Sequence, residues 1–271
     1  MKLGLYLPNT NIIGGAPSYI VATGGNITTD GDYKVHTFTG DGTFEILSGQ
    51  GDVEYLVVGG GGGGSTGYGS AGAGAGGFIT GTQLMSVGNY PITIGAGGAG
   101  NMNIDTPTYN GSSSQFDSII SYGGGGAGTN YSYGGGNGAS GGGTVRSNPK
   151  GLSIYAGGYD GGESSGNAYA GSGGGGANEV GYPSIGSDAG NGGNGKYFYG
   201  NAYCGGGGGS SYFGTIQLAI GGIGGGGNAT DCTSLNDGTI NSGGGAGGQR
   251  SYGCHAGQGG SGIVILRYKF Q

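Results

Sequence analysis

The sequence predicts an all-β protein in which strands near the two ends of the chain support a glycine-rich middle. Glycine supplies 82 of the 271 residues, and each glycine in a helix costs about 1 kcal/mol relative to alanine. The apolar residues gather in short runs rich in β-branched and aromatic side chains, which favour strands. We therefore expect a small β-sandwich or sheet, a region of packed polyglycine II-type helices and loops, and no significant α-helix.

The same glycine content also favours disorder. Fixing a residue costs roughly 1–2 kcal/mol, and glycine loses more freedom than any other residue. A disordered linker, however, has no need of compact apolar runs such as Val53–Val58, Tyr90–Ile94 and Ile263–Phe270. These runs have strand length, so they indicate a folded chain in which something also orders the glycines.

Charge and apolar patterning exclude two classes of protein. The chain has 8 Lys+Arg against 14 Asp+Glu and a net charge of −6, so it cannot neutralise many phosphates and we expect no nucleic-acid partner. No stretch approaches the 18 apolar residues of a membrane span. The apolar stretch after Lys2 stops at Pro8 and is too short for a secretory signal.

The odd count of 3 cysteines and the missing signal suit assembly in a reducing cytoplasm.

Residues 1–17 form a separate, irregular head with two prolines and a Gly-Gly pair. One interpretation is a tail that lies along the surface. The other is an anchoring peptide that enters a partner protein through its apolar side chains. The candidate anchoring residues are Leu3, Leu5, Tyr6, Leu7, Ile12 and Ile13.

The glycine-rich domain itself is expected to span residues 18–271, with its first β region at 18–58. The alternating run 33–38, the Asp-Gly turn at 39–43 and the returning run 44–47 predict a β-hairpin. A second turn is expected at 48–52. The following run, 53–58, is almost continuously apolar, as in a strand covered on both faces.

Residues 59–262 are the polyglycine region, and its glycine runs are too unevenly spaced for a strict repeat. Two inserts, 89–94 and 113–122, are predicted to be strands. A final strand at 263–270 is expected to pair with 53–58 and so close the region at its base. Glycine runs in the polyproline II conformation rise about 3.1 Å per residue and bond laterally. We favour a bundle of such helices over loops draped on a sandwich.

Motifs for catalysis or metal binding are weak. The run Gly190–Lys196 matches G-x-x-x-x-G-K, but Tyr197 stands where a Mg²⁺-binding Ser or Thr is required, and chance matches are frequent in such a sequence. Cys204, Cys232 and Cys254 lack zinc-site spacing. Three buried, reduced thiols are the favoured interpretation, with one disulfide as the alternative. Cofactors and metals are not expected.

Aromatic side chains in the inserts are the candidate contact residues. Such side chains give rigid, amphipathic contact area and dominate recognition surfaces. The alternative is that they cover the glycine bundle and supply the core that it lacks. The candidates are Tyr131, Tyr133, Tyr155, Tyr159, Tyr197, Phe198, Tyr199, Tyr203, Tyr212 and Phe213.

Several segments in a fixed order resemble a known family. They are Tyr33–Phe44, the run Glu54–Gly64 (EYLVVGGGGGG), Tyr90–Gly98 (YPITIGAGG) and Gly259–Tyr268 (GGSGIVILRY). Together they resemble the glycine-rich domain of bacteriophage tail and fibre proteins. The polyglycine-helix adhesins at the ends of T-even-type long tail fibres are similar in physical idea only. The irregular head, 1–17, departs from a long fibre shaft.

The resemblance implies a non-enzymatic virion protein, assembled in the host cytoplasm. Its form would be a short fibre or adhesin that contacts a saccharide or protein of the host surface through aromatic loops. The alternative is a decoration, head-fibre or tail protein with a purely structural role. By analogy with fibre proteins, a homotrimer is expected. An ice-binding protein would need a flatter, more regular face, and no residue pattern picks out a hydrolytic carboxylate pair.

Overall fold

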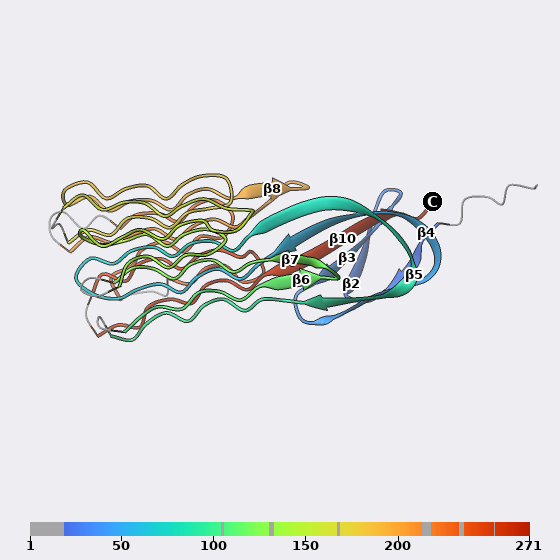
Figure 1. Cartoon of the computed structure of the whole chain (residues 1–271), viewed down its shortest axis with the longest axis horizontal. Helices are drawn as coiled ribbons and strands as arrows, with labels where there is room; N and C mark the ends of the chain where they lie inside the picture. Colours follow the sequence, from blue (N-terminus) through green and yellow to red (C-terminus); the bar gives the residue numbers. More distant parts are fainter. Residues whose placement is uncertain are drawn as a thin grey trace, which may run out of the picture.

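The computed structural model describes residues 19–103, 106–129, 133–166, 169–212, 218–232, 236–251 and 253–271. This part of the chain is sheet-rich and without helix, which confirms the all-β prediction. Figure 1 shows a β-sheet at one end of an elongated molecule and a bundle of extended segments at the other. The strands are β1 (Val21–Thr23), β2 (Asn26–Asp30), β3 (Tyr33–Phe38), β4 (Gly42–Val58), β5 (Phe78–Thr93), β6 (Ser114–Phe116), β7 (Ile119–Ser121), β8 (Lys196–Phe198), β9 (Asn201–Tyr203) and β10 (Ile263–Lys269).

The main sheet has the order β2-β3-β10-β4-β5-β6-β7, with β1 on the first part of β4. As expected, the last strand pairs with the strand that precedes the glycines: Ile263 lies opposite Val58 and Tyr268 opposite Val53, in antiparallel register. The long antiparallel pair of β4 and β5 bends over the rest of the sheet (Figure 1). The two ends of the glycine-rich region therefore leave and re-enter the sheet side by side.

Three strand predictions need correction. Strands β3 and β4 do not form the hairpin that the Asp-Gly turn predicted, because β10 lies between them and pairs with both. The expected turn at 48–52 is instead a register irregularity within a continuous β4. Strand β5 begins at Phe78, inside the segment assigned to polyglycine, since β4 supplies a partner along its whole length. The hairpin β8–β9 also interrupts that region.

Both faces of the central strands are covered, which explains their continuous apolar runs. On β10, Val264 and Leu266 point into a core that contains Phe44, Ile46 and Phe116. The alternate residues face a second, smaller cluster formed with the glycine bundle and the β8–β9 hairpin. That cluster contains Ile263, Leu56, Val58, Ala75, Ala177, Tyr203 and Cys204, with Ile265 and Phe198 packed against it.

Residues 59–64 show how the bundle is held together. Their amides point in turn to three different neighbours, so every third residue bonds the same one. Gly59 donates to the carbonyl of Gly77 at 3.1 Å, and Gly62 donates to that of Gly74 at 2.9 Å. The other amides follow the same rule: Gly60 and Gly63 donate to Ser112 and Tyr109, and Gly61 and Gly64 donate to Gly260 and Gly257.

The carbonyls of the same segment accept hydrogen bonds from three further neighbours. Gly60 and Gly63 accept from Gly124 and Ala127, whereas Gly62 accepts from Ala246 at 3.1 Å. Gly98 donates to Gly61 in the same way. The central segment thus has six extended neighbours and a period of three, as expected of a threefold helix without internal hydrogen bonds. The lateral bonds satisfy its backbone.

Close approach of these segments explains the demand for glycine. A Cβ atom on Gly61, Gly62 or Gly63 would collide with a backbone carbonyl of the neighbouring segment, from Gly244, Gly125 or Ala99 respectively. Some alanine methyls pack inside the bundle, as in the small cluster of Ala71, Ala73 and Ala127 with Val145.

Asparagine and aspartate side chains complete the hydrogen bonding at the outer edges of the bundle. Asn194 Oδ1 accepts from the amide of Ile223 at 2.9 Å, and Asn191 Oδ1 accepts from that of Ile220 at 3.0 Å. Asn137 Oδ1 does the same for Leu152. These side-chain carbonyls accept the hydrogen bonds that the carbonyls of a further backbone segment would otherwise accept.

The direction of each segment decides at which end its insert lies. Residues 59–64 run away from the sheet, and residues 71–77 return to it. The turn 65–70 therefore lies at the far end of the bundle, which we call the tip (Figure 1). By the same alternation the described parts of 144–150, 163–170, 210–218, 230–236 and 249–256 also lie at the tip, because the segments before them run outward.

Candidate functional site

Three tyrosines from separate turns meet at the tip. The ring of Tyr212 lies 4.6 Å from that of Tyr68, edge to face, and 6.5 Å from that of Tyr169. Arg146 extends over the Tyr169 ring, with its guanidinium carbon 4.3 Å from the ring centroid. Arg250 donates from Nη2 to the carbonyl oxygen of Tyr212 at 3.2 Å. We call these five residues the tip cluster.

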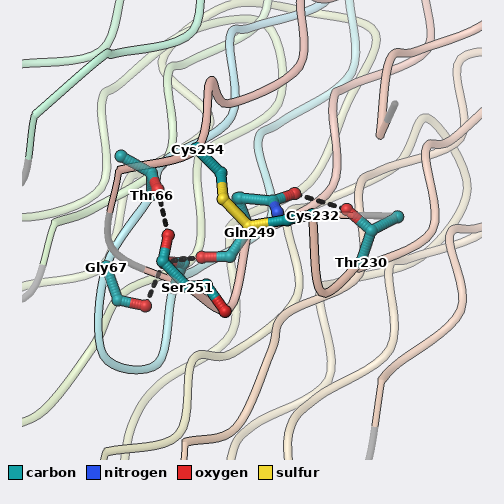
Figure 2. The surroundings of a disulfide bond; sticks show 8 residues. Thr66, Gly67, Thr230, Cys232, Gln249, Ser251 and Cys254 are labelled. Atoms are coloured by element: carbon teal, nitrogen blue, oxygen red, sulfur yellow. Dashed lines mark hydrogen bonds between the residues drawn. A yellow bond between two sulfur atoms is a disulfide. The ribbon is translucent and has the colours of Figure 1, made fainter. Parts of the chain in front are cut away.

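A disulfide lies beside this cluster. Figure 2 shows Cys232 bonded to Cys254, with Thr66, Thr230 and Gln249 around them. The hydroxyl of Thr66 donates to the carbonyl of Ser251 at 2.9 Å, and Thr230 donates to the buried side chain of Gln249 (Figure 2). These contacts join the turns that begin at residues 65, 230 and 249.

The disulfide corrects the expectation of three reduced thiols. Only Cys204 is free, and it is fully buried where the bundle meets the sheet. Burial raises the pKa of its thiol strongly, so it is an inert packing residue. Cysteine spacing alone could not select this pairing, because only the fold brings residues 232 and 254 to the same end of the bundle.

A groove of about 380 Å³ runs along the tip between two of its turns. It is lined by Ser147, Asn148, Pro149, Lys150, Leu152, Glu163 and Ser164. Lys150 forms ion pairs with Glu163 at 3.2 Å and Asp160 at 3.6 Å, so its charge is already balanced. Arg146 precedes the groove on the same turn and adopts a left-handed φ of 57°, a conformation often found at functional sites.

The structure divides the predicted contact residues between the two ends. Tyr133 and Tyr212 are at the tip, with exposed fractions of 40% and 36%. Tyr155 lies at the sheet end, where it stacks on Tyr122 at 3.8 Å. Tyr159 is exposed on the side of the bundle nearer the sheet. Tyr131 and Phe213 lie outside the described residues, as do the anchoring candidates Leu3, Leu5, Tyr6, Leu7, Ile12 and Ile13.

Four predicted contact residues belong instead to the β8–β9 hairpin, which packs against the sheet through the second, smaller cluster. They are Tyr197, Phe198, Tyr199 and Tyr203. Tyr203 is buried, so it offers no contact surface, and Phe198 packs beside it. Tyr197 is exposed. This hairpin lies at the opposite end of the bundle from the tip cluster, where the bundle meets the sheet (Figure 1).

Tyr199 closes an ionic cluster that fastens the hairpin to the sheet. Its hydroxyl donates to Glu54, which also accepts from Arg267 at 2.8 Å. The Arg267 guanidinium lies between the rings of Tyr33 and Tyr199. Burial alone would raise the pKa of Glu54, but the hydrogen bonds from Tyr199 and Arg267 outweigh it and lower that pKa. A groove of about 560 Å³ beside Arg267 is lined by this paired Glu54 and Arg267, and also by Asp52 and Lys269.

The glycine-rich bundle agrees with a comparison to protein families. A family model described as a glycine-rich domain matches residues 36–269. The chain belongs to this family. The match runs from β3 to the end of β10, so the glycine-rich domain includes both the sheet and the bundle. No curated protein matches the chain.

The described part of this glycine-rich domain contains no helix with the length and apolarity of a membrane crossing. Nor do its described residues bring together three His, Cys, Asp or Glu side chains in a metal-binding group. What the tip of the domain offers chemically is aromatic surface, two guanidinium groups and exposed amide and hydroxyl groups. These groups can recognise a ligand through stacking and hydrogen bonding.

Proposed function

We propose that this glycine-rich domain is a bacteriophage virion protein of the short-fibre or adhesin type, without enzymatic activity. The observation that carries the proposal is the separation between the sheet end and the tip of the domain. Tyr19, the first described residue, and Gln271 both lie at the sheet, whereas the tip cluster lies at the far end of a cross-bonded bundle (Figure 1). A rigid spacer with attachment at one end and aromatic turns at the other suits display on a particle.

Attachment is assigned to residues 1–17, which precede Tyr19 in the sequence. In this proposal their apolar side chains enter another virion protein, and three copies of the chain associate on the particle. Deleting residues 1–17 is expected to abolish incorporation into particles while the remaining domain folds normally. Particles that still carry the truncated protein would contradict the anchoring role.

A decoration protein without a receptor is the second candidate. It is favoured by exposed apolar residues on the side of the bundle, among them Val180, Ile220 and Ile223, whose exposed fractions exceed one half. An exposed apolar surface of this kind can pack against neighbouring virion proteins. In that case the tip would have no ligand of its own.

Binding of the purified, fluorescently labelled protein to cells of the host bacterium separates the two candidates. The adhesin proposal expects saturable binding that Tyr212→Ala weakens. Tyr197→Ala is the matched control, because it removes an exposed tyrosine at the opposite end. Absence of saturable binding, or equal loss with both variants, would contradict a receptor-binding tip.

A further inference from the structure

Arg250 is a cation at the tip whose charge is not balanced by any described carboxylate. The ion pairs found among the described residues are those of Lys150 and Arg267, and Arg250 takes part in none of them. The guanidinium of Arg250 uses one donor for the carbonyl of Tyr212. A guanidinium carries five N–H donors in a planar fork, so most of this fork remains available to a ligand.

The backbone that carries Arg250 is fixed. Its amide donates to the carbonyl of Thr230 at 2.8 Å, and the amide of the preceding Gln249 donates to Ser65 at 2.8 Å. The nearby disulfide between Cys232 and Cys254 ties the same turns together (Figure 2). The guanidinium is therefore held at the tip by a rigid frame, which reduces the ordering cost of binding.

Aromatic faces lie next to this cation. Tyr212, whose carbonyl holds Arg250, stands edge to face with Tyr68 and is partly exposed. Tyr169 adds a third ring, covered on one side by Arg146. Aromatic rings provide a rigid apolar surface on which the C–H face of a sugar ring can stack.

The combination of ring surface and fork favours one class of ligand. A guanidinium pairs with a carboxylate through two parallel hydrogen bonds, and a neutral sugar would leave that capacity unused. A dense polyanion such as a nucleic acid is disfavoured, since the whole chain has a net charge of −6. A carbohydrate with isolated carboxylates can pair with the guanidinium and is not a dense polyanion.

We propose that the tip binds a saccharide that carries a carboxylate group. Arg250 pairs with the carboxylate, and the tyrosines at residues 68 and 212 pack against the sugar ring. This inference rests on the proposed adhesin function and names the ligand class of the same tip.

The test uses the full chain and the surface polysaccharide isolated from the host cells, before and after chemical reduction of its carboxylates to alcohols. Binding is measured by calorimetry and, in parallel, on intact cells. We expect binding to the native polysaccharide and at least tenfold weaker binding after reduction, since a charge-assisted pair contributes roughly that factor. Equal binding to both forms would overturn the inference.

Variants assign the effect to the tip. Arg250→Gln is expected to weaken binding about tenfold or more, and Arg250→Lys, which keeps the charge without the fork, to weaken it less. Lys150→Gln is the matched control: it removes a cation from the same end whose charge is already balanced, and binding should change less than about twofold. Equal effects of Arg250→Gln and Lys150→Gln would overturn the assignment. Thermal unfolding of each variant verifies that it is folded. If Arg250→Gln does not fold, the binding of Arg250→Lys is compared with that of Lys150→Gln instead.

The two levels of the proposal fail in different ways. If the protein binds intact cells but not the isolated polysaccharide, the saccharide class is wrong and the adhesin function stands. If it binds neither, the adhesin function itself fails, and the inference that rests on it fails with it.

Discussion

Replacing Gly62 by alanine tests the packing of the bundle at its centre. The added Cβ would collide with the carbonyl group of Gly125, and Gly62 cannot move aside freely. Its amide donates to Gly74 at 2.9 Å and its carbonyl accepts from Ala246 at 3.1 Å.

The expected cost follows from these contacts. Inserting a methyl group into a packed interior costs about 1–3 kcal/mol, and weakening the two backbone hydrogen bonds adds about 1 kcal/mol each. The sum is about 3–5 kcal/mol. For a domain of this size, that corresponds to a fall in Tm of roughly 10 °C.

Calorimetric unfolding of Gly62→Ala measures the effect, with Gly40→Ala as the control. Gly40 lies in an exposed turn where an added Cβ would have no atom within 4 Å, so its substitution should change stability by about 0.5 kcal/mol or less. A Gly62→Ala protein that unfolds within about 2 °C of the wild type, on the same scale, would refute the reasoning.

Three further predictions concern the disulfide, a buried histidine and the free thiol. The double variant Cys232→Ser, Cys254→Ser should lose about 3 kcal/mol of stability, given a sequence separation of 22 residues; amide exchange should accelerate at 230–232 and 249–251, and unchanged exchange there would contradict the role of the bond as a staple. His36 is buried against Gly24 and Tyr268; burial lowers its pKa from 6.5, against the opposing effect of the Gly24 hydrogen bond. Its contribution to stability is therefore complete above pH 6.5 and is lost as the pH falls towards the lower folded-state pKa; urea unfolding across this range should show a shallower pH dependence for His36→Gln, and an unchanged slope would argue against it. Because burial raises the pKa of Cys204, a thiol reagent should label no cysteine in the native protein, one after denaturation, and all 3 after denaturation with reduction; rapid labelling of the native protein would show that the thiol is accessible.

The sequence allowed the base of the fold to be predicted because local patterns there are strong. The apolar runs 53–58 and 263–270 predicted two paired strands, and they pair in the structure. The hairpin predicted from the Asp-Gly turn was wrong, because β10 arrives from the far end of the chain and takes the place between β3 and β4. Turn propensity carries no information about such a long-range partner.

The tip cluster as a whole could not be predicted, because the residues around one aromatic insert carry no information about which other turns it meets in the fold. Tyr68 and Tyr169 were not among the candidates, whereas Tyr203 was and is buried. A usable signal is the alternation of direction: each glycine run crosses the bundle and the insert after it reverses the chain, so successive inserts fall at opposite ends. Counting from Val58 places Tyr68 at the far end. The pairing of Cys232 with Cys254 follows only once that alternation is known.

Amide hydrogen exchange of the glycines in 59–64, resolved residue by residue by NMR, tests the lateral hydrogen bonding of the bundle most directly. The structure gives each of these amides a backbone acceptor on another segment. They should therefore exchange as slowly as the amides of Val57 and Leu266 in the sheet, and far more slowly than that of the exposed Gly40. Exchange of 59–64 at the rate of Gly40 would contradict a cross-bonded bundle and leave the tip without a rigid support.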